Sequence, residues 1–144
     1  LRAYAPEKIR IIPEAVSSAE GELTLYIPVL RGEPLVGWAS LAPGNCPDTA
    51  EHLTRTVPVR PLDAVGLERT GFIKIDVEGH EYEVLKGAEQ TLRRDRPVLL
   101  IEIREANLEP IRAFLKPLGY REVTLRELAG VDGMEGNYLF IPAM

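Results

Sequence analysis

The pattern of apolar and polar positions divides the chain into an irregular first part and a regular second part. Ile9–Ile12 is a short apolar run typical of a buried strand, and residues 21–27 alternate as a half-buried strand does. From Pro28 to Pro58 there is little periodicity, which predicts a long loop. Eight of the 12 prolines lie between Pro6 and Pro61, and this density also favours loops.

The second half alternates strands with helices. Apolar runs and apolar spacings of three and four predict strands at 72–77, 98–103, 120–125 and 137–141, and helices at 81–94 and from Pro110 to Gly119, unless Pro117 ends the second helix a turn earlier. A strand–helix–strand series requires an at least partly parallel sheet, so we expect an α/β fold. Ligands of such sheets bind at the carboxyl ends of the strands.

Charged residues are concentrated at the ends of two of these predicted strands. Lys74, Asp76 and Glu78 fall on one side of the first strand, and Glu102 ends the next one. In a central strand Lys74 would be buried and paired with Asp76, whereas in an edge strand this face would be solvated. The apolar neighbouring strand favours the central position.

Asp76, Glu78 and Glu102 are therefore the candidate chemical groups, together with the flexible Gly79. Carboxylates at this position can accept a hydroxyl proton, bind an amine-bearing cofactor or ligate a hard cation such as Mg²⁺. The competing interpretation of Asp76 and Glu78 is that they favour the start of the following helix. A carboxylate like Glu102 at the end of an apolar strand is costly unless it is paired or used. Metal-assisted chemistry is the weaker alternative, because no histidine joins them at ligand spacing.

One further residue and one pair of residues receive structural interpretations. His80 follows the turn and is interpreted as an exposed residue rather than a general base. Trp38 with Ser40 is interpreted as an anchor of the 28–58 loop rather than a cover over a ligand.

Composition narrows the possible partners. The chain has 144 residues with 45% hydrophobic and 27% charged residues, the values of one ordinary globular domain. Its net charge of -5 argues against nonspecific binding to nucleic acids and against a basic membrane-binding surface. No apolar run approaches the length of a membrane span. One cysteine, Cys46, allows neither an intrachain disulfide nor a cysteine-based zinc site, so we expect a reducing, cytoplasmic compartment.

One segment carries a dense family pattern. The run from Phe72 to Ala88, FIKIDVEGHEYEVLKGA, together with Arg96, Pro97 and Glu102, resembles the FkbM family of S-adenosylmethionine-dependent methyltransferases. Residues 57–63 and 13–21 resemble the upstream parts of the family pattern more loosely.

The resemblance implies a Rossmann-like class I methyltransferase sheet, in which parallel strands are followed by a terminal antiparallel hairpin. The family's glycine-rich turn, of the type D-x-G-A-x-x-G, does not occur in these residues. We therefore expect residues 1–144 to be a single partial methyltransferase domain that lacks the first two strands. Residues 1–6 would end the second helix, Ile9–Ile12 would be the third strand, and a gap would separate it from the strand at 72–77.

The same resemblance implies S-adenosylmethionine as cofactor and O-methylation of a hydroxyl on a sugar or another small metabolite. Asp76 or Glu78 would accept the proton, Glu102 would frame the acceptor pocket, and the 28–58 loop would cover it. Cofactor-binding residues would be Asp76 and Gly79 at the methionine end, with Glu14 and Ala15 near the adenine. No metal is implied.

The partner would be a small-molecule acceptor, and the chain would bind neither a nucleic acid nor a membrane. The oligomeric state stays open. These residues alone would be inactive. The alternative is a noncatalytic methyltransferase-like fragment that acts as a binding or interaction module, and the missing glycine-rich turn favours it.

Overall fold

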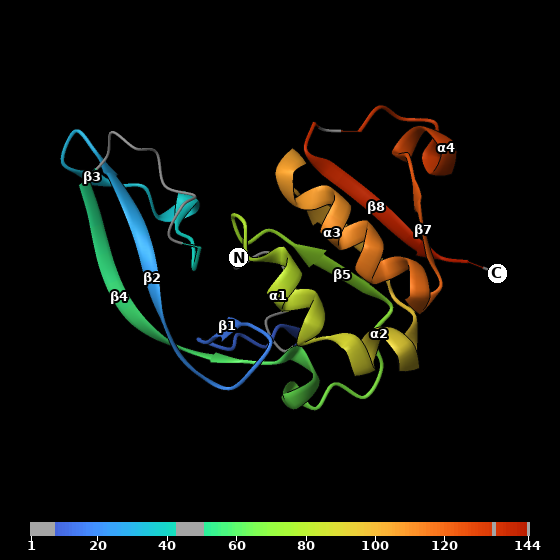
Figure 1. Cartoon of the computed structure of the whole chain (residues 1–144), viewed down its shortest axis with the longest axis horizontal. Coiled ribbons are helices and arrows are strands. Elements are labelled where there is room, and N and C mark those ends of the chain that lie inside the picture. The colour runs from blue at the N-terminus through green and yellow to red at the C-terminus, as the bar shows by residue number, and fades with distance from the viewer. Residues whose placement is uncertain (1–7, 43–50, 134, 144) are drawn as a thin grey trace.

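The computed structural model describes residues 8–42, 51–133 and 135–143, and these form a mixed α/β fold with two four-stranded sheets (Figure 1). The strand orders are β1-β4-β2-β3 and β5-β6-β8-β7. The α/β prediction is thus confirmed for the described residues. Residues 1–6 and Cys46 lie outside them.

The second sheet carries the predicted strand series. β5 (Phe72–Ile75) pairs in parallel with β6 (Val98–Glu102), and β8 (Asn137–Pro142) lies antiparallel between β6 and β7 (Tyr120–Val123). The four strands occur where the apolar runs predict them, although β5, β6 and β7 end one or two residues early. The chain therefore ends in an antiparallel pair of strands, as expected.

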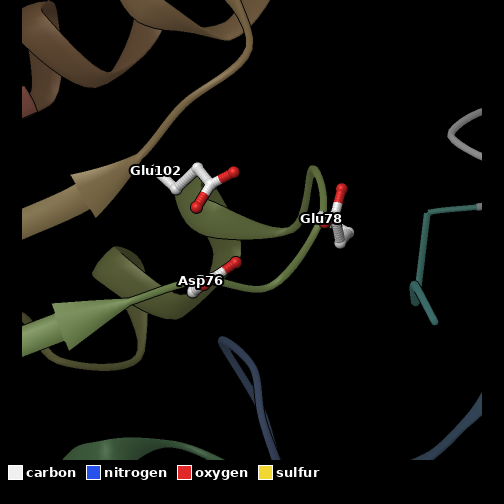
Figure 2. A group of neighbouring side chains, drawn as sticks. All are labelled: Asp76, Glu78 and Glu102. Carbon is white, nitrogen blue, oxygen red and sulfur yellow. The ribbon is translucent and has the colours of Figure 1, made fainter. Parts of the chain in front are cut away.

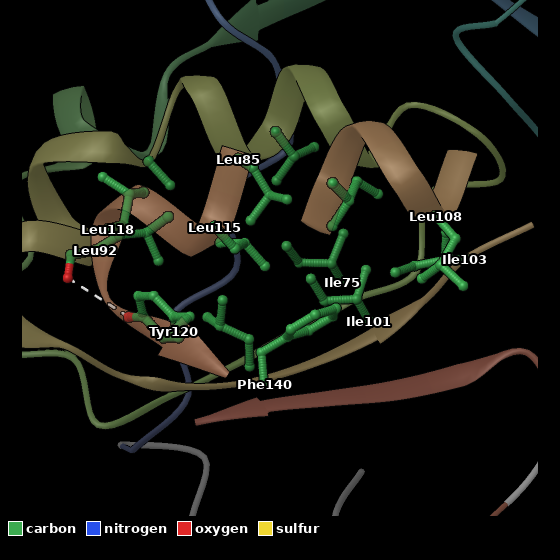
Figure 3. Close-up of a cluster of buried hydrophobic side chains, with 14 residues drawn as sticks. Ile75, Leu85, Leu92, Ile101, Ile103, Leu108, Leu115, Leu118, Tyr120 and Phe140 are labelled. Atoms are coloured by element: carbon green, nitrogen blue, oxygen red, sulfur yellow. Dashed lines mark hydrogen bonds between the residues drawn. The ribbon is translucent and has the colours of Figure 1, made fainter. Parts of the chain in front are cut away.

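Three helices cover one face of this sheet and enclose the main core (Figure 3). They are α1 (Glu81–Lys86), α2 (Glu89–Asp95) and α3 (Glu105–Leu115). The side chains that they bury with the sheet to 2% exposure or less include Leu85, Leu92, Leu99, Ile101, Ile111, Leu115 and Phe140. The apolar spacing in the sequence thus identifies the buried helix faces correctly.

The end of α3 follows the earlier of the two predicted positions. The α-helix stops at Leu115, and a 3-10 turn, η4 (Lys116–Leu118), contains Pro117. Gly119 closes this turn in the left-handed region, with φ 77°. A proline removes a backbone donor, and its ring clashes with the preceding helical turn, so the α-helix ends just ahead of it.

The single helix predicted at 81–94 is wrong, because a tertiary contact divides it at Gly87. A Cβ atom on Gly87 would lie 2.0 Å from the backbone oxygen of Ser17. The neighbouring 3-10 turn η3 (Leu62–Val65) then caps the second helix. Its Asp63 carboxylate accepts hydrogen bonds from the backbone N–H groups of Gln90 and Thr91 at 2.9 and 2.8 Å. Two short helices therefore replace one longer helix.

A further short helix, α4 (Leu125–Ala129), follows β7 where the sequence analysis places the end of a strand. Thr124 accepts a hydrogen bond from the backbone N–H of Glu127, whose carboxylate bonds back to the Thr124 N–H. This reciprocal capping box ends the strand and starts the helix.

The predicted loop from Pro28 to Pro58 is wrong over much of its described length. β2 (Gly21–Leu30) and β4 (Glu51–Arg60) form a long antiparallel ribbon, to which β3 (Glu33–Pro34) and the 3-10 turn η2 (Val36–Trp38) belong. Figure 1 shows this ribbon extending away from the helices. A two-stranded ribbon leaves many backbone groups without a ladder partner, so strand prolines are tolerated. Residues 43–50 lie outside the described part.

The strand predicted at Ile9–Ile12 is also wrong. The first strand is β1 (Ala15–Val16), which pairs in parallel with the end of β4, and Ile11 is 78% exposed. An apolar run indicates burial only where a surface covers it, and the pairing with β4 is confined to Ala15 and Val16, so Ile9–Ile12 lies outside it. In the described residues no helix is long and apolar enough to cross a membrane.

Gly87→Ala should lower the free energy of unfolding by about 3 kcal/mol, because the new methyl group meets backbone atoms that cannot rotate away. Gly71→Ala is the matched control. Its Cβ would meet nothing within 4 Å, so the change should stay within about 0.5 kcal/mol. Urea unfolding measures both. Equal midpoints for the two variants would contradict the close contact at Gly87.

Candidate functional site

The site begins at the turn between β5 and α1. Glu78 adopts φ 51° and Gly79 φ 99°, so two consecutive residues are left-handed. The conformation costs a non-glycine residue about 1–3 kcal/mol and persists only where its surroundings enforce it. Here the Ser40 hydroxyl donates to the Glu78 carbonyl at 2.6 Å, and the Gly79 N–H donates to the Glu81 carboxylate at 2.5 Å. The turn is fixed from both sides.

The turn and the two parallel strands bring three carboxylates together. Pairing of Ile75 with Ile101 places Asp76 and Glu102 at the same end of the sheet, and Glu78 approaches from the turn (Figure 2). One oxygen from each carboxylate lies within 4.8 Å of the others. They line a cavity of about 390 Å³ together with Gly79 and Arg104. The expectation that Glu102 lies near Asp76 is confirmed.

Two cations offset the repulsion between these carboxylates. Lys74 Nζ lies 3.6 Å from Asp76 and 3.8 Å from Glu102, and an Arg104 nitrogen lies 3.2 Å from Glu78. The Lys74 side chain is 37% exposed. In the described residues β5 is the edge strand of its sheet, so the expectation of a central, buried Lys74 is wrong, and the solvated alternative holds there.

A second cavity, of about 480 Å³, lies on the other side of Asp76. It is lined by β1, the end of β5 and His80, and it includes Glu14 and Ala15. The Glu14 carboxylate is paired with the Arg60 guanidinium. Asp76 lines both cavities, so the predicted residues fall into two groups that meet at this side chain.

His80 is not simply exposed, which corrects the sequence interpretation. Its Nε2 atom lies 3.0 Å from the Ser17 hydroxyl. Burial lowers the pKa of His80 below its ordinary value of 6.5, although the carboxylates of Glu83 and Glu81 oppose the effect. The imidazole is therefore held in its neutral form at neutral pH.

The anchor of the ribbon is Ser40 rather than Trp38. Trp38 is 55% exposed, whereas Ser40 is 1% exposed and bonds the turn. The anchoring role predicted for Trp38 with Ser40 therefore belongs to Ser40, and no local signal in the sequence marks its bond to the turn. Arg104 could have been found, because it follows β6 by two residues and the same strand-end argument applies.

Glu81 is 1% exposed, and its carboxylate also accepts from the Asn107 amide at 3.4 Å.

The three carboxylates of the site can take part in three kinds of chemistry. Three clustered carboxylates can accept a proton, bind an amine or another organic cation, or coordinate a hard divalent cation through oxygen. Of these groups Glu78 is the most enclosed, with 24% of its side chain exposed against 51% for Asp76 and 49% for Glu102.

One comparison with known proteins identifies a family for this chain. Residues 3–122 match the family model described as the methyltransferase FkbM domain. Among solved structures, the crystal structure of methyltransferase FkbM from Methylobacillus flagellatus KT is similar, with 23% sequence identity and a TM-score of 0.48. That alignment covers 60% of this chain and 23% of the other, so the chain spans less than a quarter of the similar protein. No curated protein matches the chain.

The lowered pKa of His80 predicts a pH-dependent stability. Since unfolded His80 takes up its proton at a higher pH than the folded residue, the unfolded state binds more protons below about pH 6.5. The contribution of His80 to the free energy of unfolding should therefore be fully present above this pH, and it should be lost as the pH drops from 6.5 to 5. Urea unfolding of the wild type and His80→Gln across pH 5–8 measures this. His52 is present in both proteins, and parallel curves would contradict the prediction.

Proposed function

Because the chain belongs to the family of methyltransferase FkbM domains, we propose that it provides the acceptor side of an S-adenosylmethionine-dependent methyltransferase site. The acceptor is a hydroxyl group on a sugar or another small metabolite. One observation carries this proposal most strongly: Asp76 lies where two cavities meet, beside Glu78 and Glu102. A transfer between two bound molecules needs two such adjoining spaces with a reactive group between them.

The charges at this junction fit the proposed cofactor. S-adenosylmethionine carries a positive sulfonium and an amino group, and carboxylates are the protein groups that bind such cations. Asp76 lies within reach of both cavities, and Glu14 and Ala15 line the one assigned to the cofactor. The net charge of -5 agrees with a small neutral or cationic partner rather than a nucleic acid.

In the proposed reaction, the acceptor oxygen forms a bond to the methyl carbon, and the carbon–sulfur electron pair stays on sulfur. The hydroxyl proton passes to a carboxylate of the protein. We assign this proton to Glu78, because it lines only the acceptor cavity and is the most enclosed of the three carboxylates. Arg104, 3.2 Å away, balances the charge of Glu78 before the proton arrives.

Asp76 and Glu102 would orient rather than react. Lys74 bridges them, with Nζ within 4 Å of both, and this ties the ends of β5 and β6 together. Correct orientation of two reactants contributes roughly 7–11 kcal/mol to such a transfer, and a positioned base a further factor of about 10²–10⁴. No metal is required for this scheme.

We also propose that β5-β6-β8-β7 is one side of a Rossmann-like class I methyltransferase sheet. The resemblance of the sequence places two more strands between Ile9–Ile12 and the strand that is β5. Because Ile9–Ile12 is not a strand, we propose the space between β1 and β5 for them, where both strands line the cavity of about 480 Å³. Because these 144 residues contain no glycine-rich turn of the family type, they would bind the cofactor poorly alone.

Calorimetric titration of S-adenosylmethionine tests the cofactor assignment. We expect binding by a form extended at its N-terminus with a segment that carries the glycine-rich turn, and at least a hundredfold weaker binding by the 144 residues alone, which contain no such turn. S-adenosylhomocysteine serves as the second ligand. Binding by neither protein form would support the noncatalytic interaction module instead.

Substitutions in the N-terminally extended form separate the two carboxylate roles. Asp76→Asn should weaken cofactor binding at least tenfold, because it removes a charged hydrogen-bonding partner. Glu78→Gln should leave cofactor binding unchanged but lower turnover by about 10²–10⁴. Glu109→Gln is the control, since Glu109 pairs with Arg112 on an exposed part of α3. If Asp76→Asn changed neither affinity nor turnover, the site assignment would be wrong.

A further inference from the structure

A buried hydroxyl connects the ribbon to the turn between β5 and α1. Ser40 is 38 residues away from Glu78 in sequence, yet it is 1% exposed, and its Oγ atom lies 2.6 Å from the Glu78 carbonyl oxygen. Its backbone N–H and C=O both bond Tyr26 on β2, each at 2.9 Å. The hydroxyl is thus fixed to the ribbon at one end and to the turn at the other.

The Ser40 hydroxyl can donate in only one direction. Its oxygen accepts the backbone N–H of Ala42 at 3.0 Å, and its single proton is directed to the Glu78 carbonyl. A serine hydroxyl has one donor and two acceptor positions, so the donor is fully used in this contact.

The same peptide unit is bonded on its opposite side. Its N–H belongs to Gly79 and donates to the Glu81 carboxylate, which is buried and also accepts from Asn107 of α3. The peptide between Glu78 and Gly79 is therefore clamped between the ribbon and the helices. Rotation of this peptide would turn the left-handed Glu78, and with it the direction of its side chain.

We propose that Ser40 is a positioning residue that directs the Glu78 carboxylate toward Asp76 and Glu102 by fixing the peptide between Glu78 and Gly79. The chemical role of Glu78 rests on the proposed function, whereas the positioning itself does not. The ribbon thereby becomes part of the site, although its own exposed side chains, such as Trp38, lie outside the carboxylate cavity.

Amide hydrogen exchange of Ser40→Ala tests the clamp without any ligand. The exchange of the Gly79 amide should become about tenfold faster, the effect of losing one buried hydrogen bond, while the amides of Ile111 and Leu115 in the core helix α3 keep their rates. The carboxyl ¹³C resonance of Glu78, identified by its loss in Glu78→Gln, should also shift. Ser40→Thr keeps the hydroxyl and should restore both signals.

Ser18→Ala is the matched control, because the Ser18 hydroxyl also bonds the helical part, at the Glu83 carboxylate, but does not contact the turn. It should leave the Gly79 amide unchanged. The proposal is overturned if Ser40→Ala leaves the exchange rate of the Gly79 amide unchanged, because Ser40 would then not hold the turn. It is also overturned if Ser40→Ala accelerates the exchange of all amides equally or abolishes cooperative unfolding, because Ser40 would then stabilise the whole fold. It is overturned as well if Ser40→Thr behaves like the alanine variant. Neither signal involves S-adenosylmethionine, so a failure to bind it leaves this result unaffected.

Discussion

The parallel pairing of β5 with β6 is the constraint on which the site depends. The register that sets Ile75 beside Ile101 is fixed by burial, because both side chains are at most 3% exposed in the core beneath the helices. A slip of one residue would turn every side chain to the opposite face. With the register fixed, Asp76 and Glu102 must emerge at the same end of the sheet, and the following turn has to bring Glu78 to them.

The parts of the molecule that were predictable from sequence are those whose structure follows from local apolar patterns. β5, β6 and the buried faces of the helices are of this kind, since their apolar positions all pack into one core between the sheet and the helices. That Asp76 and Glu102 lie close to each other followed from one further rule, namely that the carboxyl ends of parallel strands lie at the same edge of the sheet. The pattern between Phe72 and Ala88 supplied the family.

The incorrect predictions share a different physical origin, which is contact between residues far apart in sequence. The helix divides at Gly87, where the Ser17 backbone leaves no space for a Cβ atom and the Gly87 carbonyl accepts the Asp63 N–H, and nothing near Gly87 in the sequence indicates these contacts. The ribbon was mistaken for a loop because its prolines lie in a two-stranded part of the sheet, where missing donors are tolerated. Ser40 was not recognised as part of the site because its partner is a backbone carbonyl 38 residues away.

The charge balance of the site bears on the direction of the proposed reaction. Three carboxylates face two cations, Lys74 and Arg104, so the cluster keeps a net negative charge that attracts a positive ligand. In the proposed transfer the sulfonium charge disappears, and the attraction that favours the substrate is absent for the neutral thioether product. Lys74 and Arg104 moderate this attraction, because each lies within 4 Å of a carboxylate and offsets part of the negative charge of the cluster. The same two cations thus limit how tightly the site holds its positively charged ligand.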